Sequence, residues 1–311
     1  MKKKLFTLVC LFAMLSSILL ACSQAVPTGK VVQNVVVSQV GETAKEEVDA
    51  VTKKIAQEKA EAEAKAEAEA KAEAEAQAEK EQEAAQNQAT KVEAIPGQHR
   101  NPNSAVVVID PGHQLRGDST KEPNGPGSST MKARVTSGTT GVATGVAEYI
   151  MNLEVSLKLK TELENRGYTV YMTRSTHDVN ISNKERAEYA TSVGADIAVR
   201  IHGNGSANSS VHGVETYAPS YNNPYVSHLA KASQSLSQCI VDAYSATTGF
   251  KNRGVFTSDT MTGINWSTVP VTIIELGYMS NAQEDWLMQD EIMQNNMVQG
   301  IANGIDTYFG F

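Results

Sequence analysis

From residue 104 to the C-terminus, short runs of apolar residues alternate with segments in which apolar residues recur every three or four positions. The apolar runs predict strands over 106–110, 168–173, 195–201, 211–217 and 269–274. The helical spacing predicts helices over 148–165 and 182–192 and from 224 onwards, a helix start at 281, and a final helix with Met297, Ile301, Ile305 and Tyr308 on one stripe. Alternating strands and helices indicate an α/β fold, in which one sheet has helices on both faces.

Local patterns refine three of these segments. Ser182 and Asn281 each stand three residues before a glutamate, a spacing that predicts capping boxes at the starts of two helices. In the first helix, Ile150, Leu153 and Leu157 form the expected apolar stripe. The segment between the first strand and this helix is long, rich in Gly, Ser and Thr, and carries several basic residues. We expect it to be a functional or mobile loop.

The N-terminus has the pattern of an export signal. Met-Lys-Lys-Lys precedes an apolar run from Leu5 to Leu20, as in secretory signal peptides. The run ends in Leu-Leu-Ala-Cys22, which resembles the processing box of bacterial lipoproteins. That class is cleaved before the cysteine and acquires a lipid on its sulfur, and two acyl chains hold a protein firmly on a membrane. The alternative is an ordinary signal peptide, or a retained anchor, with an incidental cysteine.

Composition divides the rest of the N-terminal third. After a predicted signal peptide at 1–21, residues 22–41 are small, polar or β-branched, and we expect a disordered spacer. Residues 42–94 are dominated by Ala, Glu, Lys and Gln, which favours a solvated helix. About 45 helical residues would reach on the order of 70 Å. A disordered charged linker is the alternative, and a coiled coil has little support because large apolar residues do not recur at a and d positions.

The domain proper is predicted to span 95–311, beginning at Ile95-Pro96-Gly97. The formal net charge of the whole chain, −8, argues against a nucleic-acid partner. Cys10 lies in the segment expected to be removed and Cys22 is the expected lipidation site, so Cys239 has no partner left. We therefore predict no intramolecular disulfide.

Three residues at the edges of predicted elements form a candidate metal site. His113 follows the first strand, His202 follows the strand over 195–201, and Glu148 begins the first helix. Two imidazoles and one carboxylate are suitable ligands for a zinc ion, and they leave its fourth coordination position open for water or substrate. Each residue alone has an ordinary structural explanation, such as a helix cap for Glu148. The combination is what indicates a site, and the other histidines of the domain have no comparable setting.

Glu275 is the candidate for proton transfer. It closes the apolar run 271–274, where a carboxylate is seldom buried without a partner. If it lies at the same sheet edge as the histidines, it can act as general base and then as general acid. Asn204 and Arg200 flank His202 and are candidates for contacting substrate or an oxyanion. Arg200 is also expected to neutralise a carboxylate nearby.

Five ordered stretches resemble one family, the zinc-dependent type 3 N-acetylmuramoyl-L-alanine amidases of bacterial cell walls, and the resemblance covers residues 104 to about 310. The stretches are Val-Val-Ile-Asp-Pro-Gly-His113, Glu148-Tyr-Ile-Met-Asn-Leu153, Leu163-Glu-Asn-Arg-Gly-Tyr-Thr-Val-Tyr-Met-Thr-Arg174, Ala195-Asp-Ile-Ala-Val-Arg-Ile-His202-Gly-Asn204 and Val269-Pro-Val-Thr-Ile-Ile-Glu275-Leu-Gly-Tyr-Met-Ser-Asn281. The resemblance implies a twisted mixed sheet flanked by helices.

The resemblance also implies a function. His113, Glu148 and His202 would bind one Zn²⁺ per chain, and Glu275 would be catalytic. The bond cleaved would join the lactyl group of N-acetylmuramic acid to L-alanine of the peptidoglycan stem peptide. Together with Cys22, this places the protein on the outer face of the cell membrane, facing the wall.

The chain departs from the family pattern in the cleft. Gln114-Leu115 stands where Gly-Gly is usual, the loop before Glu148 is longer, and Arg200 replaces a common serine. The main alternative function is a non-catalytic peptidoglycan-binding lipoprotein on the same fold. A zinc peptidase acting on proteins is a second alternative, but the His-Glu-x-x-His pattern is absent from the sequence.

Overall fold

The computed structural model describes residues 102–311. Its central sheet consists of β1 (Val106–Pro111), β4 (Thr169–Met172), β5 (Ile197–Asn204), β6 (Val214–Ala218), β7 (Asn252–Thr257) and β8 (Val271–Tyr278). The longer helices are α3 (Glu148–Asn165), α4 (Asn183–Ser192), α5 (Ala230–Thr248), α7 (Ala282–Gln289) and α8 (Glu291–Phe309). The remaining elements are β2 (Asp118–Pro123), β3 (Met131–Val135), α6 (Thr262–Asn265) and the 3₁₀ turns η1 (Pro102–Ser104) and η2 (Ser227–Leu229).

The predictions for the N-terminal third lie outside the described residues. They are the signal peptide over 1–21, the lipidation of Cys22, the spacer over 22–41 and the helical linker over 42–94. The predicted start of the domain at 95 lies there as well, so all of these stay predictions.

The sheet has the order β4-β1-β5-β8-β6-β7. The first four strands in this order run parallel, whereas β6 is antiparallel to β8 and parallel to β7. Strands β1 and β5 are buried on both faces, which explains why they appear in the sequence as continuous apolar runs. The expected mixed sheet is confirmed, and the carboxyl ends of β1, β5 and β8 lie at one edge, where ligands bind in such folds.

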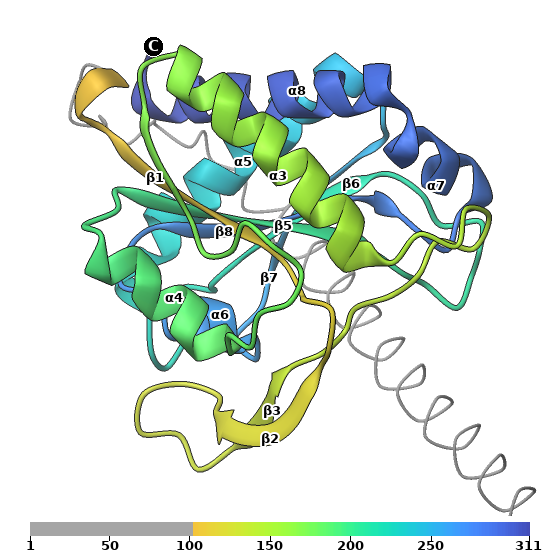
Figure 1. The fold of residues 1–311 in the computed structure, drawn as a ribbon. Helices are drawn as coiled ribbons and strands as arrows, with labels where there is room; N and C mark the ends of the chain where they lie inside the picture. The colour runs from red at the N-terminus through yellow and green to blue at the C-terminus, as the bar shows by residue number, and fades with distance from the viewer. Residues whose placement is uncertain (1–101) are drawn as a thin grey trace, which may run out of the picture. The chain divides into compact units, whose positions relative to one another are not determined.

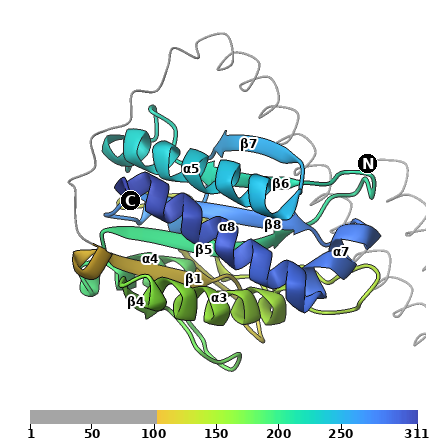
Figure 2. The ribbon, with the colours of Figure 1, turned by 90° about the horizontal axis from the view of Figure 1, so that it is seen from above.

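Helices cover both faces of the sheet, as expected (Figure 1). Helices α5, α8 and α3 lie side by side over one face (Figure 2), and α8 packs against both of the others. Helices α4 and α6 cover the opposite face (Figure 1). Alternation along β1 assigns its side chains to two cores: Val107 and Ile109 join the α3–α8 core, and Val108 joins the core beneath α4.

The apolar stripe predicted for α3 is partly wrong. Leu153 is buried, but Leu157 is 42% exposed, and the buried stripe runs instead through Met151, Val155 and Leu159. Both series fit a helical period, because apolar residues occur around most of this helix. Since α3 packs against the sheet on one side and α8 on another, the packing selects the second series.

The segment expected to be one long loop contains an antiparallel hairpin, β2–β3. Strand β2 is Asp-Ser-Thr-Lys-Glu-Pro. Because these residues are nearly all polar, they lack the alternation of apolar and polar positions that predicts a strand. The structure also adds β7 and α6, which were not predicted. The sequence of β7 has only a weak apolar pattern, because this strand lies at the edge of the sheet and most of its residues are half-buried.

Several predicted boundaries and one cap also change. The helix predicted from 224 begins only at Ala230, after the turn η2, and the strand predicted over 211–217 is β6. Strands β5 and β8 continue past His202 and Glu275, so these residues lie within the strands and not after them. The capping box at Ser182 is confirmed. At Asn281 the cap is present, but Glu284 accepts hydrogen bonds from the backbone N–H groups of Gly213 and Tyr278 and so does not close a box.

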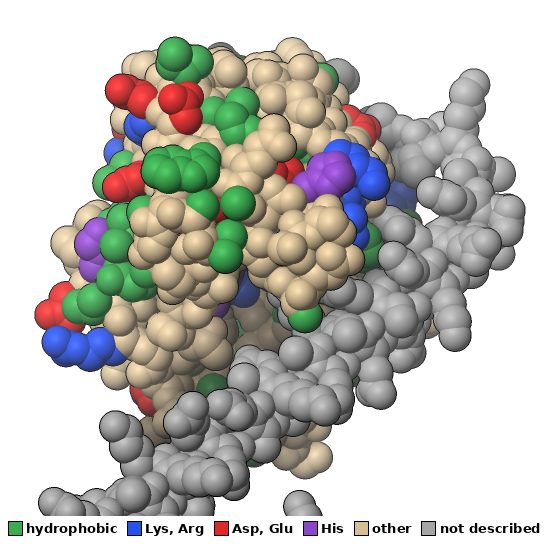
Figure 3. Space-filling view, turned by 90° about the vertical axis from the view of Figure 1, so that its right-hand side faces the viewer, with side chains coloured by type: hydrophobic (Ala, Val, Ile, Leu, Met, Phe, Trp, Pro, Cys, Tyr) green, Lys and Arg blue, Asp and Glu red, His purple; other side chains and the backbone are tan. Residues whose placement is uncertain are grey.

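The surface mixes apolar and polar side chains. On the face in Figure 3, hydrophobic side chains lie in small groups among polar and charged ones. The large exposed apolar residues include Trp286 on α7 and Ile292 on α8. Within residues 102–311, none of the helices combines the length and apolar character that a membrane span needs.

Candidate active site

The structure brings His113, Glu148 and His202 together at the carboxyl edge of the sheet. Strand β1 ends in Asp-Pro, and after Gly112 the next residue, His113, adopts a left-handed backbone conformation (φ 59°). The Nε2 atom of His113 and the Nδ1 atom of His202 each lie 3.2 Å from Oε1 of Glu148. One ligand atom from each residue lies within 4.8 Å of the others.

Hydrogen bonds orient this cluster. The Nδ1 atom of His113 lies 2.9 Å from the carbonyl oxygen of Thr136, so its Nε2 atom faces Glu148. Glu148 accepts hydrogen bonds from the backbone N–H groups of Thr139 and Gly203 and from the side-chain amide of Asn152. Outer partners of this kind set the ring orientation of a ligating histidine.

The protonation states of the cluster suit a cation. Burial alone would raise the pKa of Glu148, but the neighbouring charge of His113 and hydrogen bonds from both histidines hold it well below its usual range. Burial lowers the pKa of His202 to about 4, so its imidazole is neutral at neutral pH. An ionised carboxylate and a neutral imidazole are the forms that bind a metal ion.

Two glycines allow this close approach. A Cβ atom on Gly112 would lie 2.3 Å from the His202 ring, so only glycine lets the ring lie against the β1 turn. Gly138 has a φ of +82°, and a Cβ atom there would lie 2.6 Å from Oε2 of Glu148 and 2.9 Å from the His113 ring.

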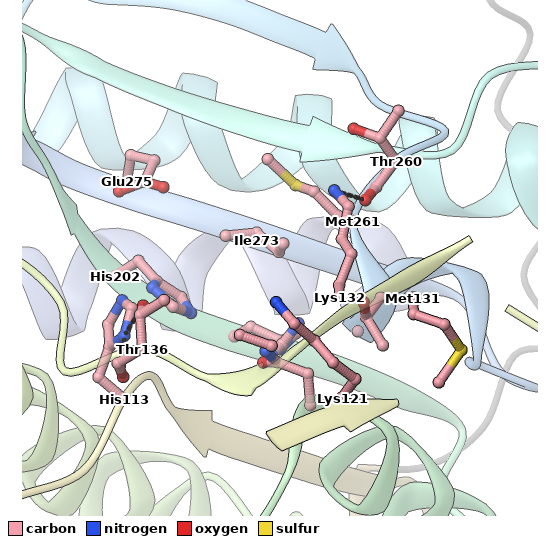
Figure 4. Close-up of a pocket in the computed structure, with 15 residues that line it drawn as sticks. His113, Lys121, Met131, Lys132, Thr136, His202, Thr260, Met261, Ile273 and Glu275 are labelled. Carbon is pink, nitrogen blue, oxygen red and sulfur yellow. Dashed lines mark hydrogen bonds between the residues drawn. The ribbon is translucent and has the colours of Figure 1, made fainter. Parts of the chain in front are cut away.

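Glu275 lies beside the cluster. It is paired with His202 in the register of β5 and β8, which places both side chains on one face of the sheet. Both residues line a pocket of about 530 Å³ together with His113 and Arg200. Figure 4 shows Glu275, His202 and His113 at the same end of this pocket. The arrangement places a carboxylate beside a cluster of metal-ligand type, and the role of Glu275 in proton transfer stays a prediction.

Comparison with known proteins decides the family. A family model for N-acetylmuramoyl-L-alanine amidase matches residues 107–307. The chain belongs to this family. The resemblance seen in the sequence over residues 104 to about 310 is thereby confirmed.

Individual relatives are similar to the chain in sequence. The chain is 29% identical to the amidase LytC of Bacillus subtilis over 168 residues, which cover 54% of this chain and 32% of LytC. It is 25% identical to the probable cell wall amidase LytH of Staphylococcus aureus over 217 residues, 68% of this chain and 61% of LytH. The chain therefore spans about a third of LytC and three fifths of LytH.

Solved structures match the described domain almost end to end. The catalytic domain of CwlV, an amidase from Bacillus (Paenibacillus) polymyxa var. colistinus, has 30% identity and a TM-score of 0.54, covering 66% of this chain and 98% of its own. The amidase Ami1 of Mycobacterium abscessus has 26% identity and a TM-score of 0.60, with the same coverage.

Arg200 and Asn204 have different positions in this amidase domain. Arg200 lines the pocket, and its guanidinium donates to Asp110 (2.7 Å) and Asn183 (2.8 Å). Arg200 thus has the neighbouring carboxylate that its position in the sequence led us to expect. Asn204 does not line this pocket, and its side-chain amide donates to Glu215 (2.7 Å). Contact between either residue and substrate stays a prediction.

Two buried carboxylates of the amidase domain were missed in the sequence. Glu215, on the strand beside Glu275, accepts hydrogen bonds from Arg253, Asn204 and the hydroxyl groups of two tyrosines. Asp110 binds both Arg186 and Arg200 at 2.7 Å. Each carboxylate lies within or directly after an apolar run, which is the signal that could have found them, because buried carboxylates require partners.

Removing the charge of Asp110 is expected to destabilise the domain. Burial would raise the pKa of Asp110, but Arg186, Arg200 and the Thr173 hydroxyl hold it far below its usual range. Asp110→Asn leaves two buried guanidinium groups without a counter-charge, which costs about 3–5 kcal/mol of unfolding free energy. Denaturant unfolding of the purified protein measures this loss.

The loss of stability caused by Asp110→Asn is expected to depend on pH. The pKa of Asp110 is lower in the folded protein than in the unfolded chain, where it is about 4. The contribution of the Asp110 charge to the free energy of unfolding is therefore complete above about pH 4 and declines as the pH falls further. The difference in unfolding free energy between wild type and Asp110→Asn is thus expected to become smaller in acid. Asp178→Asn is the control, because Asp178 is 76% exposed in its pair with Arg116. Equal stability of the two variants would contradict the assigned role of Asp110.

Proposed function

We propose that this chain is a zinc-dependent amidase that hydrolyses the bond between N-acetylmuramic acid and L-alanine in peptidoglycan. The observation that carries the proposal is the cluster of His113, Glu148 and His202 with Glu275 on the neighbouring strand, in a chain of this family. A mere binding module would not require both a metal-type cluster and a proton-transfer group in one pocket.

The residues present fit a zinc ion. Two ligands of a tetrahedral zinc, each about 2.0–2.1 Å from the metal, lie about 3.3 Å apart. The Nε2 atom of His113 and Oε1 of Glu148 are separated by 3.2 Å. The Nε2 atom of His202 is buried and has no hydrogen-bond partner within the part of the chain that the structure describes. When bound, zinc supplies Lewis-acid chemistry, polarising a carbonyl group and making hydroxide available near neutral pH.

The protein's own groups then have distinct tasks. Glu275 accepts a proton from the attacking water and delivers it to the departing amine. The amide C–N bond is broken, leaving a lactyl carboxylate on the sugar and a free amino group on L-alanine. The Arg200 guanidinium, although paired with Asp110, lines the pocket, where it can help to stabilise a developing oxyanion.

The proposal extends to where the enzyme acts. Cell-wall amidases among its relatives support action outside the cytoplasmic membrane. A lipid on Cys22 would hold the protein on the outer face of the membrane, and the 42–94 linker would carry the domain towards the wall. Tethering raises the local enzyme concentration at its substrate.

Digestion of purified peptidoglycan by the full chain tests the function. Mass spectrometry is expected to find stem peptides with a free N-terminal L-alanine, together with peptide-free glycan. Binding to the wall without release of peptide would support the non-catalytic alternative. Cuts between amino acids within the peptide would instead indicate a peptidase. Either result would refute the amidase proposal.

A further inference from the structure

The pocket continues from Glu275 to the β2–β3 hairpin. Its far part is lined by Lys121, Met131, Lys132 and Ala133 from the hairpin, facing residues 260–263 around the start of α6. Figure 4 shows Lys121 and Lys132 on the other side of Ile273 from the Glu275 end. The hairpin therefore forms one wall of the pocket that His113, His202 and Glu275 line at its other end.

The two lysines give this wall an unbalanced positive charge. Among residues 102–311, Lys121 has no ion-pair partner, and Lys132 donates to the carbonyl oxygen of Thr260 (2.6 Å) and not to a carboxylate. Arg200, the third cation of the pocket, is paired with Asp110. In a chain with a net charge of −8, two unpaired cations in one pocket indicate an anionic ligand.

Burial strengthens this argument for Lys132. Its environment lowers the pKa of its ammonium group, because the charge is partly withdrawn from water. A charge in such a place interacts more strongly with an anion than a fully solvated lysine does.

The hairpin is held in place, so the backbone that carries the two lysines is positioned before substrate arrives. The backbone N–H of Lys184 donates to Glu122 (3.1 Å), and the Trp266 indole donates to the Pro123 carbonyl (2.8 Å). Arg134 in β3 pairs with Glu185 in α4 (2.8 Å). Preorganised groups lose less freedom on binding and so gain affinity.

We propose that Lys121 and Lys132 bind a carboxylate of the stem peptide and make the enzyme selective for substrates that carry it. This inference rests on the proposed function. Cleavage frees the amino group of the first residue, so every carboxylate of the peptide lies beyond that residue, away from the scissile bond. The anionic part of the substrate and the cationic wall of the pocket thus both lie away from Glu275.

Matched substrates test the inference. One synthetic muramoyl peptide carries free carboxylates on its peptide, and the other carries carboxamides at the same positions. We expect wild type to show a KM roughly tenfold lower for the free acid, the scale of a charge-assisted contact, with similar kcat values. The double variant Lys121→Met/Lys132→Met is expected to lose this preference.

Controls separate charge from folding. Lys121→Met alone breaks no ion pair among residues 102–311, and it is expected to lose part of the preference. Lys132→Arg keeps the charge and is expected to keep most of the preference. Lys231→Met, at an exposed position of α5 outside the pocket, is expected to behave as wild type.

The outcomes distinguish the two proposals. Wild type that hydrolyses both substrates with equal KM, or a double variant that keeps the preference, would overturn the lysine site and leave the amidase function standing. Wild type that hydrolyses neither substrate would overturn the amidase proposal and the lysine site with it.

Discussion

Glu275→Gln is expected to lower kcat by roughly 10²- to 10⁴-fold, the range over which general acid–base catalysis acts. Glutamine keeps the size of the side chain but cannot accept a proton from water. Because Glu275 is not one of the three clustered ligand residues, the variant should retain its zinc. Release of stem peptide from purified wall measures turnover, and elemental analysis of the same sample measures the metal.

A matched substitution makes this result specific. Glu154→Gln changes an exposed glutamate of α3 and is expected to leave both turnover and zinc content unchanged. A fully active Glu275→Gln enzyme would refute the proton-transfer role. Loss of zinc together with activity would mean instead that Glu275 contributes to holding the metal.

The parts of the site that were predictable lie on regular elements or directly after one. His113 and His202 were found because parallel strands end at one sheet edge, and both histidines come from runs that are buried on both faces. Glu148 was found because it opens a long helix whose bounds the sequence predicted correctly. In each case a local pattern determines the position of the residue.

What could not be predicted depends on contacts between distant segments. Nothing local to Asp110 indicates that Arg186, 76 residues away, will approach it within 2.7 Å. The β2–β3 hairpin is polar, and its position depends on contacts with α4 and with Trp266. The lysine-lined wall of the pocket and the hydrogen-bond network around Glu215 therefore become visible only in the structure.

His202→Ala is expected to weaken zinc binding by at least about 100-fold, because loss of an outer partner alone costs roughly 10- to 100-fold. Wild type should contain one zinc ion per chain, whereas the variant should contain little after dialysis. Metal that binds only the folded state also stabilises it. A chelator should therefore lower the Tm of wild type and leave that of the variant unchanged. His113→Ala is expected to behave in the same way.

His228→Ala is the control, because His228 is exposed and lies outside the pocket. Testing the histidines is more informative than testing Glu148, whose carboxylate also accepts backbone hydrogen bonds from Thr139 and Gly203 and so supports the loop and strand around it. If wild type bound no zinc when supplied with it, while remaining folded, the cluster would not be a zinc site. The non-catalytic wall-binding alternative would then account better for the chain, since the proposed hydrolysis depends on the metal.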